Sequence, residues 1–321
     1  MSGVEIIKVK RTDDGMRLDR WFKLNVPLLT HGMLQKALRK GQVRLDGKRV
    51  KASDHVSAGQ EVRVPPISQD QYEKSFKPKE KKKFRPSKEQ VEKFAQALIF
   101  ENEELAVFNK PQGLAVQGGI GQSNNVDVLL PYVLQPNEET PKLVHRIDKD
   151  TTGILVVAKT RQSAARLTAY FKKKTIHKRY LAMVMGVPIP REGTIDLPLA
   201  KGDVGNGKEK MMVDKKNGQA SRSRYRVIDF AHQKAALVEL EPVTGRTHQL
   251  RVHMAAIGHP IIGDVKYGGQ EALLDQADRK LHLHAWQLTL PSSSSNKKEQ
   301  LFEAELPAHL SATMDLLGLS V

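Results

Sequence analysis

The sequence predicts an α+β protein, in which a small helix-helix-hairpin module precedes a larger domain with a mixed, largely antiparallel sheet. Three observations predict this class. First, a chain of 321 residues exceeds the size at which a single core stops growing, about 250 to 300 residues. Second, a stretch rich in Lys, Glu and Pro divides the chain; third, beyond it strand-like segments outnumber helix-like ones. We expect the module at 1–66, a basic flexible linker at 67–95 and the larger domain at 96–321, with a short helix at the end of the linker as one alternative.

The module begins with two short helices. Apolar side chains recur at helical spacing in RLDRWFKLN (17–25) and again in HGMLQKALRKG (31–41), where Gly41 suits a helix end. Asp46-Gly47 is a strong signal for a hairpin, and QEVRVP (60–65) is typical of a further strand that ends at two prolines.

Basic residues are concentrated in the module and the linker. The formal net charge is +16, and residues 1–95 hold 23 Lys+Arg against 12 Asp+Glu, a net +11. Such an excess favours polyanionic partners, either nucleic acid or an anionic membrane surface. On the second helix Lys36, Arg39 and Lys40 share one face, which suits phosphate contacts and equally suits a solvated surface. The module resembles the small RNA-binding module first known from ribosomal protein S-four, and this resemblance implies RNA.

The larger domain alternates strands and helices. Helices are predicted at 161–174 and 247–258, where apolar residues share one face. Strands are predicted in LIFENEELAVFNKPQG (98–113), GILVVAKT (153–160), KRYLAMVMG (178–186), SRYRVIDF (223–230) and KAALVELEPV (234–243). Their hairpin-like succession predicts a sheet with helices on its faces.

The composition argues against several classes of protein. Without cysteine the chain can form neither disulfides nor thiolate metal sites. The first residues, MSGVEIIKVKRTDDG, lack the apolar run of a signal peptide, and no run approaches the roughly 18 apolar residues of a membrane span. We therefore expect a cytoplasmic protein that does not enter membranes.

One stretch, VHRIDKDTTGILVVAKT (144–160), sets acids and an arginine directly before an apolar strand. A carboxylate such as Asp148 can act as nucleophile, general base or electrostatic partner, and a nearby arginine keeps it ionised. In an extended segment Arg146 and Asp148 point to the same side. The alternative is that Asp148 or Asp150 only caps the Thr-Thr-Gly turn, which we favour for Asp150.

A second group lies in PVTGRTHQLRVH, around a predicted helix start. Thr247 is the expected N-cap, and the helix N-terminus would favour an anion. His248 and Arg251 lie one turn apart and can reach the same cleft, together with Arg246 and His253. The alternative is a basic helix exposed to solvent, although the apolar residues on its other side indicate that the helix is anchored.

Three further patterns have ordinary explanations. The histidines of that helix and HLH (282–284) have neither cysteine nor carboxylate at ligand spacing, so we expect no metal. Gly118, Gly119 and Gly121 in AVQGGIGQS lack a following Lys-Ser/Thr, which favours a turn at the rim of a cleft over a nucleotide phosphate loop. Tyr180 begins an apolar strand, where core packing is favoured over base stacking on the residues alone.

Four motifs in order resemble the RluA-type pseudouridine synthases. HRIDKDTTG (145–153) is similar to the His-Arg-Leu-Asp-x-x-Thr-Ser-Gly motif of that family. The other matching motifs are FNKPQG (108–113), KRYLAMVMG (178–186) and PVTGRTHQLRVHMAAIGHPIIGD (242–264). The resemblance covers about residues 97–310. The S-four-like module, the basic linker and LAVQGG after NKPQG make it closest to the RluC branch, with the RluD branch next.

The resemblance implies roles for individual residues. The catalytic aspartate of the family falls on Asp148, its active-site tyrosine on Tyr180, and the arginine that pairs with the aspartate on Arg251. Arg146 matches the arginine implicated in occupying the space left by a flipped base. The resemblance therefore implies that Tyr180 holds the extruded ring while Arg251 keeps Asp148 ionised and aimed.

The implied reaction converts specific uridines of large-subunit ribosomal RNA to pseudouridine. The bond from ribose to ring nitrogen breaks, the captive uracil turns, and a ring carbon rejoins the ribose. The resemblance implies no metal and no small-molecule cofactor, ribosomal RNA or its assembly precursor as partner, and a monomeric enzyme. Ile147 and Thr152 replace the usual Leu and Ser, and Gln117 stands where the RluC branch often has His. The last departure bears on the choice of target and not on the chemistry.

Two other functions are weighed against this one. A noncatalytic rRNA-binding or ribosome-assembly factor that keeps the fold would be expected to lack the acid, yet Asp148 is present. A metal-independent ribonuclease using His, Lys and Arg would cleave the strand. Whether Asp148 attacks the ribose carbon or removes a ribose proton is left open by the sequence.

Overall fold

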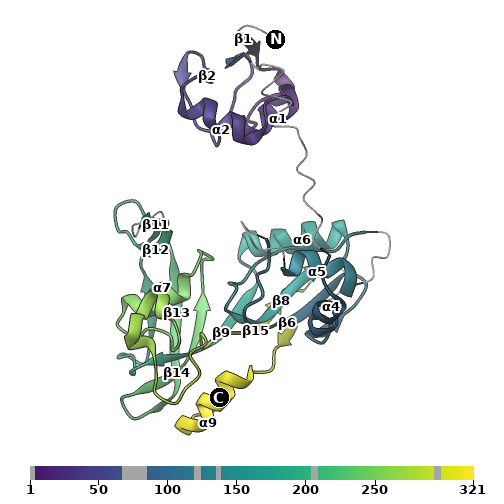
Figure 1. The fold of residues 1–321 in the computed structure, drawn as a ribbon. Helices are drawn as coiled ribbons and strands as arrows, with labels where there is room; N and C mark the ends of the chain where they lie inside the picture. Colours follow the sequence, from purple (N-terminus) through teal and green to yellow (C-terminus); the bar gives the residue numbers. More distant parts are fainter. Residues whose placement is uncertain (1–3, 67–84, 119–123, 135–138, 204–208, 293–297) are drawn as a thin grey trace. The chain divides into compact units, whose positions relative to one another are not determined.

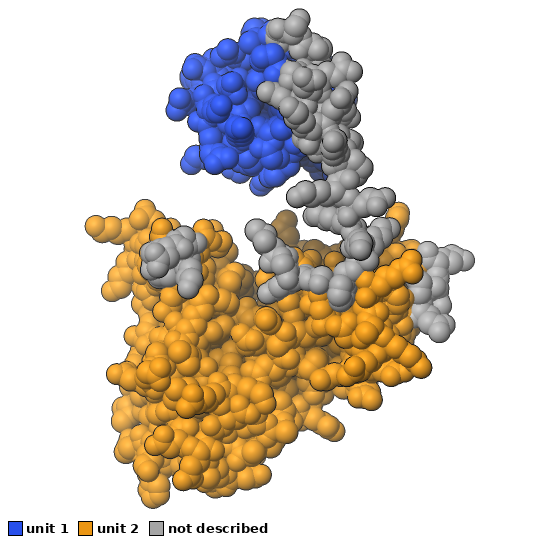
Figure 2. Space-filling model, viewed as in Figure 1, with its two compact units in different colours: residues 1–83 blue, residues 84–321 orange. Residues whose placement is uncertain are grey.

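The protein divides into two compact units, residues 1–83 and 84–321, each with its own hydrophobic core (Figures 1 and 2). The computed structural model describes residues 4–66, 85–118, 124–134, 139–203, 209–292 and 298–321. Most of the predicted linker, residues 67–84, lies outside the described residues. Among the residues that are described, no helix has both the length and the apolar character needed to cross a membrane.

The first unit packs two helices against a four-stranded antiparallel sheet of order β1-β4-β2-β3. Both central turn residues, Asp46 and Gly47, have positive φ, at 47° and 75°, as a tight two-residue hairpin turn requires. The predicted helices, hairpin and last strand are confirmed. The first strand was not predicted, and its residue Ile6 is 62% exposed. The elements are β1 (Glu5–Lys8), η1 (Arg11–Asp13), α1 (Leu18–Asn25), α2 (His31–Arg39), β2 (Arg44–Leu45), β3 (Lys48–Arg49) and β4 (Glu61–Val64).

The second unit is built on a ten-stranded sheet of order β10-β13-β14-β9-β15-β8-β6-β5, with β16 beside β15 and β7 beside β8. Among the strand pairs of the described residues, β15 with β8 is parallel and the others are antiparallel. The predicted mixed, largely antiparallel sheet is confirmed. Its strands are β5 (Leu98–Glu101), β6 (Leu105–Lys110), β7 (Lys142–Leu143), β8 (Thr152–Ala158), β9 (His177–Met185), β10 (Glu192–Asp196), β13 (Arg222–Ala231), β14 (Ala235–Pro242), β15 (Leu283–Leu290) and β16 (Gln300–Glu303).

Helices and one separate hairpin complete this unit. They are α4 (Lys88–Ala95), α5 (Val126–Val133), α6 (Arg161–Lys173), α7 (Gln249–Ala256), α8 (Val265–Gly268), η2 (Gly269–Ala272) and α9 (Ala308–Leu317), with the hairpin of β11 (Leu199–Asp203) and β12 (Glu209–Val213). Residues 88–95, which the sequence-based division assigned to the linker, form α4. Ser87 caps this helix, and its Phe94 is buried and stacks on Phe108 at a centroid distance of 4.6 Å. Burial of one large aromatic ring therefore fixes the end of the linker segment to the second unit.

Alternating side chains of the central strands bury both faces of the sheet. Along β9, Ala182 and Val184 pack with the cluster that includes α7, whereas Leu181 and Met183 pack with the cluster that includes α9. In the other half, α4 and α5 pack on one face of β6 and β8, and α6 packs on the other (Figure 1). Tyr180 contacts both the α7 cluster and the α5 cluster. It therefore marks where the two halves meet on one face of the sheet.

Candidate active site

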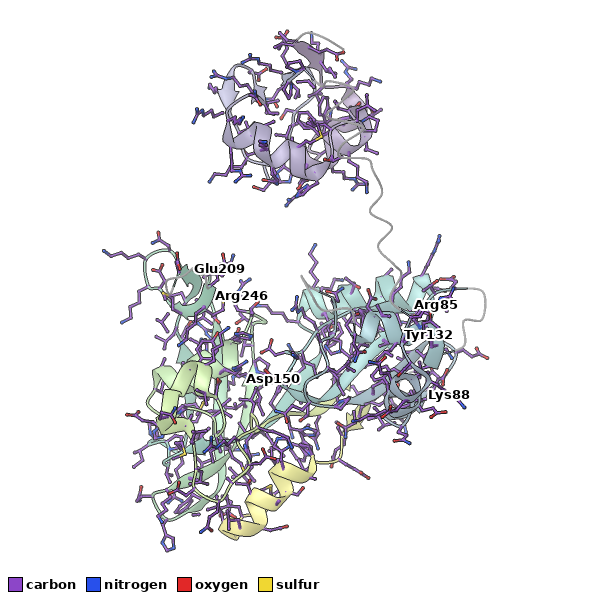
Figure 3. The ribbon with its side chains drawn as sticks, in the orientation of Figure 1. Arg85, Lys88, Tyr132, Asp150, Glu209 and Arg246 are labelled. Atoms are coloured by element: carbon purple, nitrogen blue, oxygen red, sulfur yellow. The ribbon has the colours of Figure 1, made fainter. Side chains whose placement is uncertain are left out.

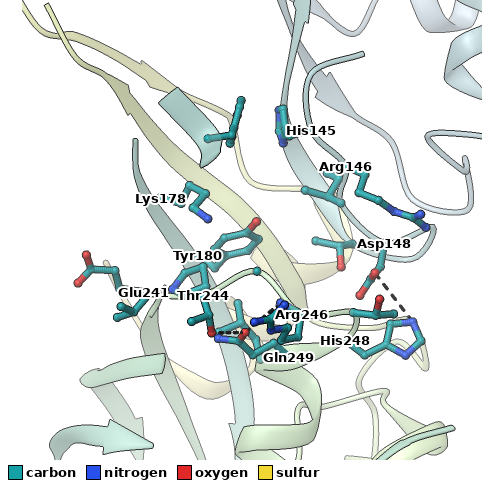
Figure 4. A pocket seen from close by; sticks show the side chains of 18 of the residues that line it. His145, Arg146, Asp148, Lys178, Tyr180, Glu241, Thr244, Arg246, His248 and Gln249 are labelled. Carbon is teal, nitrogen blue, oxygen red and sulfur yellow. Dashed lines mark hydrogen bonds and ion pairs between the residues drawn. The ribbon is translucent and has the colours of Figure 1, made fainter. Parts of the chain in front are cut away.

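A cavity of about 600 Å³ opens at this junction (Figure 4). Its walls include the segment 145–151 that precedes β8, the start of β9, and the segment 241–251 that leads into α7. The cavity brings together three residues that the sequence singled out, Asp148, Tyr180 and Arg251, and Arg146 also lines it. In Figure 3, Asp150 and Arg246 mark the loops ahead of β8 and α7.

The turn after Asp148 is fixed by a close backbone approach. Gly153 has φ of +104°, and a Cβ there would lie 2.2 Å from the carbonyl oxygen of Ala285 on the parallel neighbour β15. Thr152 Oγ1 lies 2.8 Å from His284 Nδ1, a further link between the same two strands. The Thr151 N–H donates to the Asp148 carbonyl oxygen at 3.2 Å. Only glycine fits this approach, so the Thr-Thr-Gly turn sets where Asp148 stands.

Lys110, at the end of β6, anchors the other side of the loop. Its Nζ is buried and donates to three backbone carbonyl oxygens at 2.8 to 3.0 Å, one of them that of Lys149, next to Asp148. Burial lowers the pKa of Lys110 to about 7, and the charges of Asp150 and Asp148 oppose this shift. Lys110 was not predicted as a site residue, although the motif FNKPQG contained it.

Tyr180 lies on β9 between Leu240 of β14 and Ala285 of β15. Its side chain is partly buried, packs against both hydrophobic clusters and lines the cavity. Burial, together with the negative charge of Asp148, raises the pKa of the phenol well above its usual range. The ring thus packs in the core and also lines the cavity wall, while stacking on a base stays a prediction.

Helix α7 does not begin as predicted. Thr247 is not its N-cap; His248 holds that position, with left-handed backbone angles of φ 52° and ψ 22° and no side-chain cap. Instead, the Gln249 side chain holds the preceding loop against the start of the helix. Its Oε1 accepts hydrogen bonds from Thr244 Oγ1 at 2.7 Å and from the Arg246 N–H at 3.0 Å. The predicted helix itself is confirmed, and its start is displaced because an internal glutamine replaces the cap.

Arg251 pairs with Asp264 and not with Asp148. Its Nε and Nη2 each donate to one oxygen of Asp264 at 2.7 Å, and the two side chains are 8% and 1% exposed. Although burial disfavours the guanidinium cation, the hydrogen bonds and charge of Asp264 overcome it and raise the pKa of Arg251, with Asp148 adding a weaker pull. The structure places no hydrogen bond or ion pair between Arg251 and Asp148, and Nε and Nη2 of the guanidinium face Asp264 instead.

His248 lies beside Asp148 in the cavity. The distance from His248 Nε2 to Asp148 Oδ1 is 3.9 Å, and both side chains are about one-fifth exposed (Figure 4). On its other side, His248 Nδ1 lies 2.6 Å from the hydroxyl of Tyr267 in α8. Burial lowers the pKa of His248, and Asp148 opposes the shift. The sequence had placed His248 in the cleft without a role, and no pattern had marked Tyr267.

Several cations surround the cavity beyond Asp148. Arg146 is exposed, and the lining also includes Lys174, Lys178, Arg224 and Arg246. Burial lowers the pKa of Lys178, against the pull of Glu241. These charges suit a polyanionic ligand at the mouth of the cavity.

Other predicted features lie elsewhere. Lys36, Arg39 and Lys40 are exposed at the end of α2 in the first unit. The glycine-rich turn falls largely on residues 119–123, which lie outside the described residues. Within the described ranges, no group of three or more His, Cys, Asp or Glu is arranged to hold a metal ion.

Comparison with known proteins agrees with this geometry. The RNA pseudouridylate synthase family matches residues 104–256. Ribosomal large subunit pseudouridine synthase C of Vibrio cholerae is 36% identical over 311 residues, covering 96% of this chain and 95% of that protein. The protein of the same name from Escherichia coli K12 is 35% identical over 268 residues, 84% of this chain and 81% of that protein. The solved structure of human RNA Pseudouridylate Synthase Domain Containing 4 covers 72% of this chain and 96% of its own, with a TM-score of 0.60 and 29% identity.

The family match and the relatives, which cover 72 to 96% of this chain, define an isomerase of the pseudouridine synthase class. The chain belongs to the RluA-type family of these enzymes. Within that family its similarity is to the C-type synthases of the RluC branch.

Proposed function

We propose that this enzyme isomerises uridines of large-subunit ribosomal RNA to pseudouridine, with Asp148 as the acting carboxylate. The names of its relatives support the substrate. The single observation that carries the role of Asp148 is its position in the cavity, on a loop fixed from both sides by Gly153 and Lys110.

A single reacting carboxylate suits an isomerisation. Glycoside hydrolysis generally uses two carboxyl groups, one to protonate the leaving group and one to handle water. Here the second carboxylate of the described cavity lining, Glu241, lies 3.3 Å from Arg224 and is engaged in an ion pair. Asp148 acts at the ribose when its bond to N1 of uracil breaks. The ribose then bonds to C5, whose hydrogen leaves to solvent while N1 gains a proton.

The target base must leave its stack to reach this cavity. Extrusion costs a few kcal/mol, and less in a loop than in a duplex. The Tyr180 ring, fixed between two strands, offers a flat surface for the extruded uracil. Arg146, exposed on the rim, occupies the space that the base leaves in the RNA.

The first unit supplies a second RNA contact. Lys36, Arg39 and Lys40 are exposed together on α2 and contact phosphates, which position the RNA without reading its sequence. The whole chain works as a monomer in the cytoplasm, with neither metal nor cofactor.

Release of a labelled hydrogen tests this function. Ribosomal RNA transcripts carrying tritium at C5 of uridine lose the label to water only when C5 bonds to ribose. The full-length enzyme should release tritium from a large-subunit transcript, Asp148→Asn should release none, and Asp150→Asn, an exposed acid on the same loop, should act as wild type. Binding without release by the wild type would favour the noncatalytic factor, and strand cleavage would favour the ribonuclease.

A further inference from the structure

His248 is held in a strained backbone conformation beside the acting carboxylate. Its φ of 52° lies in the left-handed region, which costs a non-glycine residue roughly 1 to 2 kcal/mol. The side chain makes no cap hydrogen bond to α7, so capping does not explain the conformation. Strain of this kind is concentrated at functional sites, where surrounding contacts hold it in place.

The surrounding contacts of His248 come from Tyr267. The two rings meet edge to face, with centroids 5.5 Å apart, and the Tyr267 hydroxyl lies 2.6 Å from His248 Nδ1. Burial raises the pKa of Tyr267 to about 12, so the phenol keeps its proton at neutral pH. We take the protonated phenol as the donor in this short contact and His248 Nδ1 as the acceptor.

Tyr267 is fixed in turn by the buried ion pair. The guanidinium of Arg251 lies 5.1 Å from the centroid of the Tyr267 ring, and Asp264 Oδ1 accepts from the Tyr267 N–H at 3.3 Å. Asp264 also holds Arg251 through two hydrogen bonds. A continuous set of contacts thus runs from the Asp264–Arg251 pair through Tyr267 and His248 to Asp148.

The tautomer of His248 follows from these contacts. A neutral imidazole has one N–H, and since Nδ1 accepts from Tyr267, the hydrogen is on Nε2. Nε2 is the atom that faces Asp148 Oδ1 across 3.9 Å. This gap is about 1 Å longer than a hydrogen bond, and such contacts often shorten only when substrate binds.

We propose that His248 is a positioning residue for Asp148: its Nε2–H, directed by the Tyr267 hydroxyl, holds one carboxylate oxygen so that the other faces the ribose of the captured uridine. The proposal rests on the proposed role of Asp148.

A double-mutant cycle tests the proposal in the full-length enzyme. His248→Asn is chosen because asparagine tolerates the left-handed backbone but is too short to reach Asp148. Loss of a hydrogen bond to a charged group should slow single-turnover tritium release at saturating enzyme by roughly 10- to 100-fold. The dissociation constant for RNA should stay within about 2-fold, since the interaction serves the transition state.

Tyr267→Phe removes only the hydroxyl that sets the tautomer, so the rate should fall by roughly 2- to 10-fold. The double variant should be no slower than His248→Asn, because the two residues act in one series. Tyr225→Phe, which loses a hydroxyl bonded to Pro190 elsewhere in the same unit, is the matched control and should keep the wild-type rate.

Three results would overturn the proposal: a wild-type rate for His248→Asn, rate losses that multiply in the double variant, or a loss confined to RNA affinity. If His248→Asn does not fold, the rates of Tyr267→Phe and Tyr225→Phe are compared instead. Equal rates of these two variants would reject the proposal. Asp148→Asn is measured in parallel. If it stays active the proposed function fails, whereas an inactive Asp148→Asn with a fast His248→Asn rejects this inference alone.

Discussion

Replacing Arg251 with methionine should destabilise the second unit as well as slow the reaction. The substitution leaves Asp264 without its partner, although this carboxylate is 1% exposed and accepts both guanidinium donors at 2.7 Å. Removing one member of a buried ion pair costs roughly 3 to 5 kcal/mol, because the other charge stays buried and uncompensated. For a unit of this size each kcal/mol lowers Tm by about 2 to 4 °C, so the fall should be about 6 to 20 °C.

Thermal unfolding of the full-length protein, followed by circular dichroism, measures this shift. The matched control is Lys280→Met, which breaks an exposed pair with Asp278 whose side chains are 57% and 37% exposed. Exposed pairs contribute at most about 1 kcal/mol, so this variant should unfold close to wild type. The double variant Arg251→Met/Asp264→Leu removes both charges and should recover most of the lost stability.

An Arg251→Met protein that unfolds at the wild-type temperature but has lost turnover would refute this reasoning. That outcome would mean that the pair with Asp264 does not stabilise the unit and that Arg251 acts on the reaction, as the family resemblance implied. A shared loss of stability and rate, with stability restored in the double variant, is the result expected from the Asp264 pair.

Four other expectations concern separate parts of the chain. Tyr180→Phe should retain the affinity for RNA measured by filter binding, whereas Tyr180→Ala should lose roughly 1 to 3 kcal/mol of binding free energy from stacking. Equal affinities of the two variants would mean that the ring serves only core packing. Gly153→Ala should unfold at lower denaturant than Gly113→Ala, which has similar positive φ but open space around it, and equal midpoints would contradict the close approach to β15. Deleting residues 1–83 should leave the rate at saturating enzyme unchanged. It should lower the magnitude of the slope of log affinity for RNA against log salt concentration by about 0.7 to 0.9 for each phosphate contact that is lost. An unchanged slope would show that the first unit does not contact RNA. Burial lowers the pKa of His145 to about 3, so this side chain stays neutral in the folded protein. The unfolded chain takes up a proton at His145 below about pH 6.5, so the free energy of unfolding should be highest above that pH and fall below it. A denaturation midpoint that does not change from pH 7 to pH 4 would contradict this expectation.

The sequence predicted those elements whose periodicity is local. The strand around Ala182 and the helix around Leu250 follow from runs of apolar residues, and the hairpin follows from Asp46-Gly47. By contrast, α4 was assigned to the linker because its own residues are mostly polar. Its place in the second unit depends on Phe94 stacking against Phe108, which is a tertiary contact that no local pattern shows.

The site was predictable as a set of residues but not as a set of contacts. The motifs brought Asp148, Tyr180 and Arg251 to one cavity, yet they did not show that Asp264 would pair with Arg251. Asp264 is 1% exposed and Asp148 is 22% exposed, so the guanidinium compensates the carboxylate with the larger desolvation cost. Tyr267 stayed unnoticed since a lone tyrosine between a lysine and glycines has no pattern of its own.

The most direct test of the central claim is a map of pseudouridines in the large-subunit ribosomal RNA of cells whose copy of this gene carries Asp148→Asn, beside cells with wild type and with Asp150→Asn. We predict that one or more pseudouridines of that RNA are present in the wild-type and Asp150→Asn cells and revert to uridine in the Asp148→Asn cells, with equal amounts of protein. An unchanged map in the Asp148→Asn cells would contradict the claim that this carboxylate performs the isomerisation.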